Sequence, residues 1–525
     1  MGNQSVFYRA CGEIVSCLLA AGRPTKQQTR QEIKRICAKY SLERIPRNHE
    51  ILSMASGSDF AQLREVLIKK PIKTASGVAV VALMPKPYAC PHGRCTYCPG
   101  GIESNSPNSY TGNEPSTINA IENNYDPRLQ IKTKIEKLAA FGHDTTKMEL
   151  VIVGGTFLFM PRDYQENFIK ACYDALNGTE SKSLAEAKAA NEHAEIRNVG
   201  LTIETKPDFC KRKHIDWMLG YGATRVEIGV QSLHEEVYKI VNRGHNYADV
   251  VESFQISKDA GYKIVAHMMP GLPTMTPKDD IDDFGKLFKD PSFKPDMLKI
   301  YPSLVVKDTP LADDYKNGLY TSYSDEDMIN VLVNVKKNIP RWVRIMRVQR
   351  EISPSEIIAG AKSGNLRQMV LHNLKRRGLA CKCIRCREIG LSGTDIQVPR
   401  LCRINYDSSG GNEVFLSFED SDDSIYGFLR LRKPSNMAHR SEIDNKTCIV
   451  RELHVLGKSL KIGQKGGNDI QHAGLGKRLM REAEKIAKEE FDCYRLLVIS
   501  AVGTRQYYQK LGYLLYGPYM SKTLD

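Results

Sequence analysis

The sequence has no long apolar run. No segment approaches the ~20 consecutive apolar residues that a membrane-spanning helix needs, so we expect no membrane span. A secretory signal is also missing from its start, because the apolar stretch 14–21 follows Glu13 and leads into charged sequence rather than a small-residue cleavage site. Internal repeats and low-complexity tracts are absent too. We therefore expect a cytoplasmic globular protein.

The composition favours a polyanionic partner. Of the 525 residues, 41% are hydrophobic and 26% are charged, which excludes a largely disordered chain. At ~150 residues per domain, this length suggests about three domains. The 75 Lys and Arg outnumber the 61 Asp and Glu, and the net charge is +14. Nucleic acid is favoured over a membrane surface as the partner, and a merely basic enzyme is the alternative.

The N-terminal region is predicted to be helical and basic. Lys26, Arg30 and Lys34 recur at helical spacing along one surface. Such a run is either a solvated helix face or a set of cations that tracks RNA phosphates. We divide the chain into this region (1–75), a strand-rich region (76–355), a basic Cys-rich connector (356–400) and a C-terminal region of mixed strands and helices (401–525).

Six short Val/Ile-rich runs alternate with helix-compatible segments in the strand-rich region. This α/β pattern predicts repeated βα units around a buried parallel sheet, closed into a partial barrel of the TIM type. Active sites of that architecture lie at the carboxyl ends of the strands, where this sequence places Gly154, Gly155, Glu204, Gln231 and His267. An Ala/Glu-rich helix at 181–195 is predicted to be a surface insertion. The six runs are 77–85, 148–155, 199–205, 224–232, 262–270 and 297–304.

A first cysteine group follows the first of these runs. Cys90, Cys95 and Cys98 have the spacing C-x4-C-x2-C. In a cytosolic chain, clustered cysteines indicate metal or redox chemistry rather than disulfides. A structural zinc site and a fully ligated [4Fe–4S] cluster each take four protein ligands, whereas a four-iron cluster with three leaves one iron for S-adenosylmethionine (SAM). We expect such a cluster, and zinc completed by His92 is the alternative.

A glycine loop opens a helix in the C-terminal region. The stretch Q-x-x-G-x-G runs from Gln471 through Gly474 to Gly476, after a strand at 448–457. Its backbone N–H groups and the positive helix end suit a pyrophosphate. Another strand and a short helix with Tyr507 and Tyr508 follow.

The cysteine loop and the glycine loop, each with the strands around it, resemble two known families. The cysteine loop, the Gly-Gly-Thr at 154–156 and the strand series resemble the radical-SAM superfamily, although its commonest spacing is C-x3-C-x2-C. The resemblance implies that Gly154, Gly155, Glu204 and Gln231 bind SAM. The C-terminal region resembles the GNAT acetyltransferase fold, an α+β domain whose loop holds coenzyme A. This implies that Tyr507 or Tyr508 contacts the CoA thiolate, unless both tyrosines only pack.

The union of both modules resembles the catalytic-subunit family of Elongator, in its single-chain archaeal or bacterial form. Matching stretches include CTYCPGG, VIVGGTF, ETKPD, VNRGH, RELHVLG and VGTRQYYQKLGY. The resemblance covers nearly all of the chain and implies catalytic roles for Tyr507, Tyr508 and Lys147. It implies acetyl-CoA contacts at Lys147, Glu452, Leu453, His454, Val455, Gln471, Gly474, Leu475, Gly476, Lys477 and Tyr508.

The implied activity is modification of the wobble uridine of tRNA with SAM and acetyl-CoA as cosubstrates. We hypothesise that a 5′-deoxyadenosyl radical takes hydrogen from the acetyl methyl group, and that the carbon radical adds to C5 of the base. Thioester hydrolysis would leave a 5-carboxymethyl group. The base lies in the single-stranded anticodon loop, so it can be turned out cheaply. The anticodon arm is the expected partner, and a homodimer or accessory subunits stay open.

A second cysteine group lies in the connector. Cys381, Cys383 and Cys386 have the spacing C-x-C-x2-C among many Lys and Arg, which suggests a structural zinc site on an RNA-facing linker. Cys402 is our first candidate for the fourth ligand, and His372 is the second. Free thiols or a second iron–sulfur cluster are the alternatives.

Two other functions compete with this interpretation. A protein lysine N-acetyltransferase with a vestigial radical domain would explain the glycine loop but not an intact three-cysteine loop. An RNA-binding scaffold with inactive modules would explain the charge alone.

Overall fold

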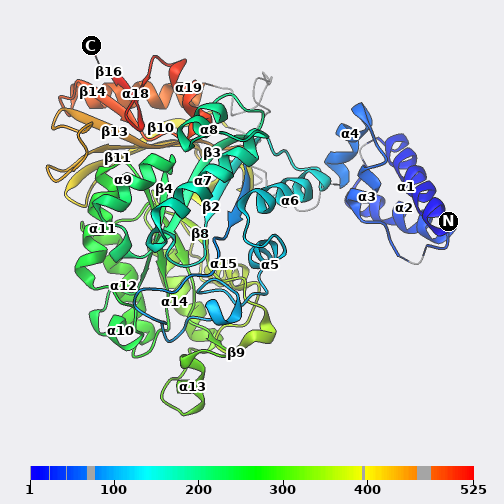
Figure 1. Ribbon diagram of the computed structural model, residues 1–525, viewed down its shortest axis with the longest axis horizontal. Helices are drawn as coiled ribbons and strands as arrows, with labels where there is room; N and C mark the ends of the chain where they lie inside the picture. The colour runs from blue at the N-terminus through cyan, green and yellow to red at the C-terminus, as the bar shows by residue number, and fades with distance from the viewer. Residues whose placement is uncertain are drawn as a thin grey trace.

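The computed structural model describes residues 2–22, 24–42, 44–67, 77–392, 397–457 and 474–524. Figure 1 shows a lobe of N-terminal helices standing beside a larger body, and a C-terminal sheet that caps that body. In these described residues, no helix combines the length and the apolar character that crossing a bilayer requires.

The N-terminal lobe has its own small core. Helix α2 is amphipathic: Ile33 and Ile36 are buried, whereas Arg30 and Lys34 face solvent. Thr25 caps this helix in a capping box with Gln28, which fixes its start. The expected basic helical region is therefore present. Its helices are α1 (Gly2–Ala20), α2 (Lys26–Lys39), α3 (Asn48–Leu52) and α4 (Gly57–Leu67).

The body is a parallel seven-stranded sheet in the order β1-β2-β3-β4-β5-β6-β8, curled into a partial barrel with helices outside (Figure 1). The strands are β1 (Ala79–Leu83), β2 (Lys147–Ile152), β3 (Arg197–Thr205), β4 (Arg225–Gln231), β5 (Lys263–Met268), β6 (Met297–Ile300) and β8 (Arg344–Arg347). The helices between them are α5 (Pro115–Glu122), α6 (Pro127–Ala140), α7 (Arg162–Asn177), α8 (Leu184–Asn191), α9 (Arg212–Tyr221), α10 (Glu235–Ile240), α11 (Tyr247–Asp259), α12 (Pro277–Lys289), α13 (Pro310–Lys316) and α14 (Asp325–Lys337).

Side chains alternate between the two faces of this sheet, as the pleat of a strand requires. Leu150, Ile203 and Val226 join the large apolar core that the helices cover. The intervening residues, such as Glu149, Glu204 and Glu227, therefore project to the inner face. That inner face therefore carries several charged side chains, which is unusual for a buried sheet.

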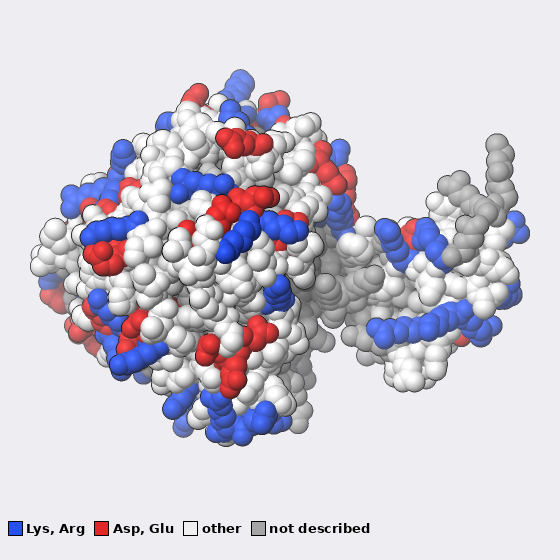
Figure 2. Space-filling view, turned by 90° about the horizontal axis from the view of Figure 1, so that it is seen from below, with Lys and Arg blue, Asp and Glu red and all other residues white. Residues whose placement is uncertain are grey.

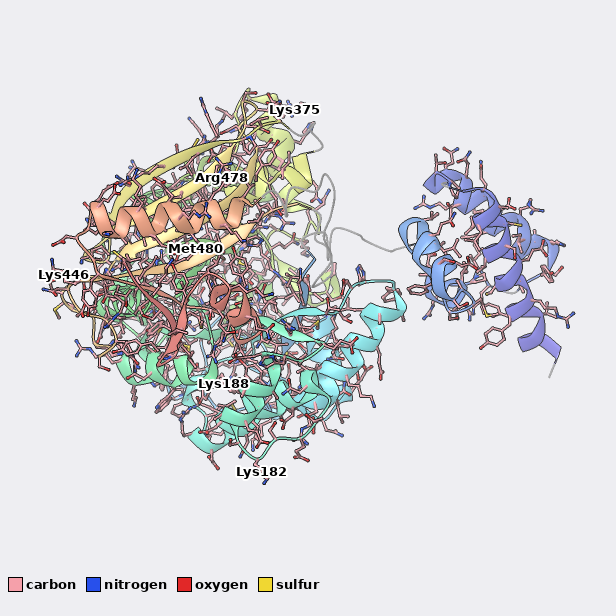
Figure 3. The ribbon with its side chains drawn as sticks, turned by 90° about the horizontal axis from the view of Figure 1, so that it is seen from above. Lys182, Lys188, Lys375, Lys446, Arg478 and Met480 are labelled. Atoms are coloured by element: carbon pink, nitrogen blue, oxygen red, sulfur yellow. The ribbon has the colours of Figure 1, made fainter. Side chains whose placement is uncertain are left out.

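The C-terminal sheet has the order β10-β11-β12-β13-β14-β16-β15. Its central pair, β13 and β14, is parallel, and the other neighbours are antiparallel. Figure 3 shows α18 lying across the sheet, with Arg478 and Met480 labelled along the helix. The elements are β10 (Arg400–Ser408), β11 (Gly411–Glu419), β12 (Ile425–Lys433), β13 (Thr447–Val455), α18 (Leu475–Glu489), β14 (Arg495–Val498), α19 (Arg505–Gln509), β15 (Leu514–Tyr516) and β16 (Tyr519–Thr523).

The connector contains short elements only. Strand β7 (Val305–Val306) pairs with β9 (Ile357–Ala359), and α15 (Leu366–Arg376), α16 (Ile384–Arg387) and α17 (Ile389–Ser392) follow. The connector was expected to present its many Lys and Arg to RNA, but one of them, Arg387, is buried in an ion pair with Glu419 of the C-terminal sheet. The exact limits of the four regions of the chain stay a prediction.

The predicted fold class is confirmed, with two differences in detail. The sheet has a seventh strand, β8, which its four residues RIMR did not reveal because two of them are charged. Helix α8 is not a free surface insertion. Glu192, the C-cap residue of α8, forms an ion pair with Arg505 of α19 at 2.7 Å. This pair joins the barrel to the C-terminal domain.

The interface between barrel and C-terminal sheet is held by buried ion pairs. Arg451 of β13 contacts Asp296, just before β6, at 2.7 Å and Glu413 of β11 at 2.8 Å. Arg432 of β12 contacts Asp259 of α11 at 2.5 Å. Burial alone would raise the pKa of Asp296, but the guanidinium groups of Arg451 and Arg430 lower it well below the usual range. The carboxylate is therefore ionised, and the two cations that stabilise it most come from the C-terminal sheet.

Replacing Asp296 by Asn is expected to weaken this docking. Arg451 and Arg430 would stay buried beside a neutral amide, and removing one partner of a buried ion pair costs about 3–5 kcal/mol. Trp342 stacks on Tyr406 of β10 at a centroid distance of 4.3 Å, so its fluorescence reports on the same interface. Urea unfolding followed by this signal should show a clearly lower midpoint in the variant.

A matched control is Glu490→Gln, which removes the half-exposed pair that Glu490 makes with Arg403. Its effect should stay below about 1 kcal/mol. Because the folded-state pKa of Asp296 is depressed, the advantage of the wild type should be full above about pH 4 and should fall as the pH drops further. Equal midpoints for the two variants would show that Asp296 does not hold the interface.

Candidate active site

The first cysteine loop lies beyond the carboxyl end of β1, and its three thiols share neighbours. Asn108 Nδ2 is 3.2 Å from the Cys90 sulfur, and the adjacent Ser109 N–H donates to the Cys98 sulfur at 3.1 Å. The Cys95 sulfur lies 3.8 Å from Nη1 of Arg243. Residues 107–109 thus bridge the first and last cysteines, and the loop presents all three thiols to one region.

Cations surround this loop. Arg243 and Lys206 are both buried there, and the Lys206 ammonium contacts Nδ1 of His92 at 2.9 Å. Burial raises the pKa of Cys98 to about 11, and the nearby Cys95 thiol adds to that rise. Burial thus favours the protonated form of Cys98 without a metal, and the adjacent cations would stabilise the anionic thiolates that metal binding requires.

The spacing of these sulfurs suits a multi-metal cluster better than a single ion. Within the described ranges, only Cys381, Cys383 and Cys386 offer three ligand atoms within 4.8 Å of one another. Cys90, Cys95 and Cys98 are more widely spaced, and His92 does not complete a compact set with them. A single tetrahedral zinc with Zn–S bonds of about 2.3 Å would need closer sulfurs. Three thiols around one cation-lined region fit a cluster.

The residues predicted for SAM line the same end of the barrel. Gly154 and Gly155 have φ angles of 111° and 97°, and a Cβ on Gly154 would come within 3.0 Å of Pro107. Glycine is therefore required where β2 passes the cysteine loop. Glu204 lies 3.5 Å from His267 Nδ1, and the Gln231 amide oxygen is buried with no partner among the described residues. An unpartnered amide of this kind suits a polar ligand.

The C-terminal sheet opens at the residues predicted for acetyl-CoA. Strands β13 and β14 pair only from Thr447↔Arg495 to Val450↔Val498. The rest of β13 continues without β14, and this unpaired part carries Glu452, Leu453, His454 and Val455. Each of the four is partly exposed. Beyond Val450, β13 therefore pairs with β12 on one side and no longer with β14 on the other.

The first turn of α18 borders this opening. Gly474 caps the helix with φ 74°, and the first N–H groups of a helix have no intrahelical acceptor. A Cβ on Gly476 would lie 2.8 Å from the Tyr507 hydroxyl, so Tyr507 covers this turn. Tyr508 is buried in the apolar core of the domain, next to Tyr507 and Tyr513. Leu475 and Lys477 belong to the same turn, and Gln471 lies outside the described residues.

Two titratable side chains, Glu452 and His454, lie on the part of β13 that does not pair with β14. Burial alone would raise the pKa of Glu452, but Arg430, bonded to it at 2.8 Å, and Lys263 lower it, so Glu452 is ionised and fixed. Burial lowers the pKa of His454, whose ring stacks on Phe428 at 5.7 Å. A neutral imidazole beside an ionised carboxylate can accept a proton.

Lys147 begins β2 at the amino end of the barrel. It is the register partner of Arg197 on β3, which donates to Gln506 of α19 at 2.9 Å. Gly503 packs so closely on Arg197 and Asn198 that a Cβ would overlap them. Burial lowers the pKa of Lys147. The neighbour of Lys147 on β3, Arg197, thus contacts α19, the helix that carries Tyr507 and Tyr508.

The two candidate sites occupy opposite ends of one barrel. The cysteine loop follows the carboxyl end of β1, whereas the C-terminal sheet docks at the amino ends, near Lys147 and Lys263. At about 3.3 Å per residue, a six-residue strand separates these ends by ~20 Å. The inner face of the barrel lies between the two sites. At its centre, Glu227 accepts a hydrogen bond from His267 at 2.8 Å and forms an ion pair with Lys299.

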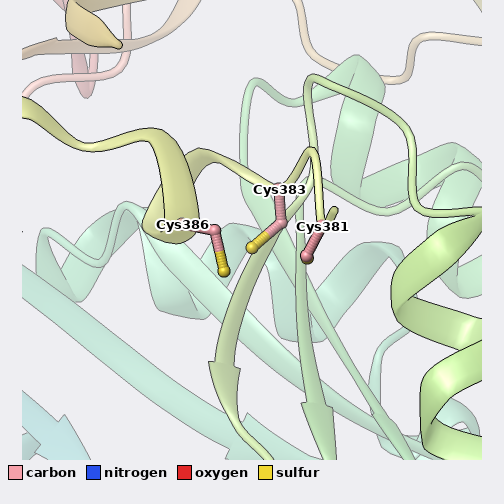
Figure 4. Close-up of side chains that lie close together, drawn as sticks. All are labelled: Cys381, Cys383 and Cys386. Carbon is pink, nitrogen blue, oxygen red and sulfur yellow. The ribbon is translucent and has the colours of Figure 1, made fainter. Parts of the chain in front are cut away.

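The second cysteine group converges in the connector. Figure 4 shows the side chains of Cys381, Cys383 and Cys386 turned toward one another, and their sulfurs lie within 4.8 Å. Neither Cys402 nor His372 belongs to this compact set, so the structure does not bring either proposed fourth ligand to it. Cys402 lies on β10 in a separate open hollow of about 510 Å³, lined also by Arg341 and Lys382.

Sequence reasoning missed the second layer of residues around the cysteine loop. It assigned no role to Asn108, Lys206 or Arg243, although ETKPD and VNRGH contain the latter two. Lys206 and Arg243 are each at least nine-tenths buried, which is rare for such residues unless they are paired. Their burial could not be read from the sequence, because it depends on the fold.

Comparisons with known proteins agree with both modules. The chain matches the models of the ELP3 N-terminal domain (residues 7–75), the Radical SAM superfamily (84–287), the Radical_SAM C-terminal domain (295–376) and the Acetyltransferase (GNAT) family (395–513). It is 45% identical to the tRNA uridine(34) acetyltransferase of Methanocaldococcus jannaschii, covering 96% of this chain and 95% of that protein. It is 43% identical to Elongator complex protein 3 of Bos taurus, covering 98% and 96%.

A solved structure is also similar. The archaeal Elp3 of Methanocaldococcus infernus, with residues 1–46 deleted, aligns with a TM-score of 0.76 and 43% identity, covering 86% of this chain and all of that one. With relatives of this identity over nearly its whole length, the chain belongs to the Elp3 family.

Proposed function

We propose that this protein modifies the wobble uridine of tRNA at C5, by a radical-SAM reaction that uses the acetyl group of acetyl-CoA and ends in a 5-carboxymethyl group. The observation that carries the proposal is the docking of a splayed CoA-type cleft onto a barrel that holds a three-cysteine loop. The related proteins named for tRNA uridine(34) acetylation support the base and the substrate class. A member of this family with both sites intact is a transferase.

Cys90, Cys95 and Cys98 would hold a [4Fe–4S] cluster, and Gly154, Gly155, Glu204 and Gln231 would bind SAM. Together, cluster and SAM would supply the one-electron chemistry that activates an unreactive C–H bond. The chain's own contribution is positioning. Arg243 and Lys206 balance the negative charge of the thiolates, and the open backbone at Gly154 and Gly155 lets a polar ligand approach closely.

The cleft would bind acetyl-CoA between β13 and the first turn of α18. Leu475, Gly476 and Lys477 would face the pyrophosphate with their N–H groups, because a helix N-terminus favours an anion. Glu452, Leu453, His454 and Val455 would border the arm, and Lys147, Tyr507 and Tyr508 would flank its reactive end. The neutral His454 is placed to take a proton from water when the thioester is hydrolysed.

The two sites would meet along the inner face of the barrel. Val80 of β1 projects to that face, because its neighbours Val81 and Ala79 join the outer core, and it is 48% exposed. Lys147 and Glu149 on the same face are partly exposed. The β1–β2 side of the interior is therefore accessible at its amino end, whereas Val151 and Val153 further along are buried in an apolar cluster. The β4–β6 side is filled by the Glu227 ion pairs. A substrate group would enter along the accessible side.

The N-terminal lobe would grip the anticodon arm. Figure 2 shows Lys and Arg side chains forming a strip on this lobe. Arg30 and Lys34 of α2 are exposed and make no ion pair within the described residues. Unpaired cations along one helix are available to phosphates.

Cys381, Cys383 and Cys386 would hold a structural zinc ion that fixes the connector. The compact spacing of their sulfurs supports one tetrahedral ion, with the fourth position supplied by another ligand. The alternatives are a second iron–sulfur cluster and free thiols.

Replacing Cys95 by Ser is expected to abolish uridine modification and to leave tRNA binding unchanged. The test uses the reduced full-length chain under anaerobic conditions with SAM, acetyl-CoA and unmodified tRNA, followed by nucleoside mass spectrometry. Cys172→Ser, which alters a buried thiol remote from the loop, should behave as wild type. Equal loss of tRNA binding and product in Cys95→Ser would assign the loop a structural role, and acetylated peptide without any RNA product would favour a lysine acetyltransferase.

Replacing Gly476 by Ala is expected to weaken acetyl-CoA binding by about tenfold, or ~1.4 kcal/mol. The new Cβ would displace the Tyr507 hydroxyl, which lies 2.8 Å away, from the turn that binds pyrophosphate. Isothermal titration with CoA measures the change. The double variant with Tyr507→Phe removes the clash and should recover most of the affinity. Unchanged binding in Gly476→Ala would place the CoA pyrophosphate elsewhere.

Replacing Cys383 by Ser is expected to remove one zinc ion per chain and to leave the iron content unchanged. Its sulfur belongs to the compact group, so its loss leaves two ligands. Elemental analysis of the reconstituted protein measures both metals. Cys402→Ser serves as the control because Cys402 lies outside the group. Iron lost in place of zinc would identify the trio as a second iron–sulfur site.

A further inference from the structure

Two cysteines of the C-terminal domain meet in space although they lie 45 positions apart in the sequence. Cys448 is the second residue of β13, and Cys493 lies in the turn between α18 and β14. The Cys448 thiol donates a hydrogen bond to the Cys493 sulfur at 3.4 Å. A disulfide needs sulfurs at about 2.05 Å, so a small side-chain adjustment would join them.

A cation activates one member of this pair. The Lys433 ammonium, at the end of β12, lies 3.0 Å from the Cys493 sulfur and also donates to the Asn445 carbonyl. The Cys448 hydrogen bond and this ammonium lower the pKa of Cys493 to about 6, against the opposing effect of burial. Cys493 is therefore a thiolate near neutral pH, and Cys448 stays a thiol that serves as its donor.

Cys210 shows how a buried thiol behaves without a cation or a second thiol hydrogen-bonded to it. Burial raises the pKa of Cys210 to about 12, and its sulfur has only the Ser257 hydroxyl as a neighbouring donor. Cys493 is itself 3% exposed, but both of its neighbours in the chain are exposed: the side chain of Asp492 is 88% exposed, and Tyr494 as a whole is 42% exposed. Opening one surface turn would therefore uncover it. In Figure 3, Lys446, which pairs with Asp492, marks this end of α18.

We propose that Cys493 and Cys448 form a covalent modification site, at which a hydroperoxide converts the thiolate–thiol pair to a disulfide. The Cys493 thiolate attacks the terminal peroxide oxygen, the O–O bond breaks, and the departing oxygen leaves as water or an alcohol after taking a proton. The Cys448 sulfur then displaces hydroxide from the resulting sulfenic acid, and its proton leaves with that hydroxide as water. The two thiols lose two electrons, and the peroxide gains them.

The disulfide would act on the CoA cleft. The loop that it closes runs from β13 to the end of α18, and it contains Glu452–Val455 and Gly474–Lys477. Oxidation would thus tie together the strand and the helix that border the cleft. A cross-link across a loop of this length stabilises the folded state, mainly by restricting the unfolded chain.

The experiment treats the reduced full-length chain with limiting hydrogen peroxide, blocks the remaining thiols with N-ethylmaleimide and maps peptides without reductant. We expect a Cys448–Cys493 linked peptide that dithiothreitol removes. In Cys448→Ser, Cys493 should instead stop as a sulfenic acid that dimedone traps. Lys433→Met should slow oxidation at Cys493 by about tenfold, because the thiolate fraction falls. Lys485→Met, a surface lysine on α18 that pairs with Glu489, should leave the rate unchanged.

A second readout does not depend on peptide recovery. Oxidised wild type should unfold about 5 °C higher than reduced wild type, and Cys448→Ser should show no such rise after the same treatment. The proposal is overturned if Cys493 stays as fully alkylated as Cys210 after peroxide. It is also overturned if Lys433→Met oxidises as fast as wild type, or if dimedone labels wild-type Cys493 without any linkage to Cys448. None of these outcomes depends on the tRNA reaction.

Discussion

Buried charge fixes how the two catalytic modules sit against each other. Arg430, Arg432 and Arg451 of the C-terminal sheet are fully buried, and each finds a carboxylate at the barrel interface. A buried guanidinium without its partner is costly, so sliding or tilting the sheet by one residue would leave several charges unpaired. An apolar interface tolerates such shifts, because dispersion contacts are non-directional. The ion pairs therefore specify one arrangement, and Glu452, bonded to Arg430, carries that arrangement directly into the cleft.

This docking places the cleft at the amino ends of the barrel strands, whereas chemistry in such barrels is usually found at the carboxyl ends. The inner face must therefore connect the two. Its residues explain how a buried parallel sheet can be polar inside: Glu227 is paired with Lys299 and His267, and the Lys299 ammonium and the His267 imidazole lower its pKa far below the usual range. These pairs fill the β4–β6 side. On the β1–β2 side, the amino end near Val80 is accessible and the carboxyl end is covered by a buried apolar cluster.

Much of this architecture could be predicted from the sequence. The six β-rich runs became β1 to β6, because Val/Ile-rich segments bounded by Gly or charge have few other stable conformations in a βα series. The point at which β13 separates from β14 could not be predicted, since nothing in TCIVRELHV distinguishes its paired from its unpaired half. Strand β8 and the interface role of α8 could not be predicted. Both depend on contacts with residues far away in the sequence, such as the ion pair of Glu192 with Arg505. The local sequence pattern does not indicate such contacts.

The cysteines show the same limit in a single residue type. Cys90, Cys95 and Cys98 are close in sequence, and so are Cys381, Cys383 and Cys386, so spacing alone identified both groups. Spacing could not separate them by chemistry, however, because only the fold shows that one set is spread among cations and the other is compact. Cys448 and Cys493 appeared to be scattered apolar residues, the default for isolated thiols. Their meeting depends on α18 returning the chain to β13, and the reactivity of the pair depends on Lys433 from a third element. The reactivity of each cysteine in this protein therefore depends on the charged groups and thiols that the fold places next to its sulfur. The spacing of cysteines in the sequence identifies a site only when all its members lie within one loop.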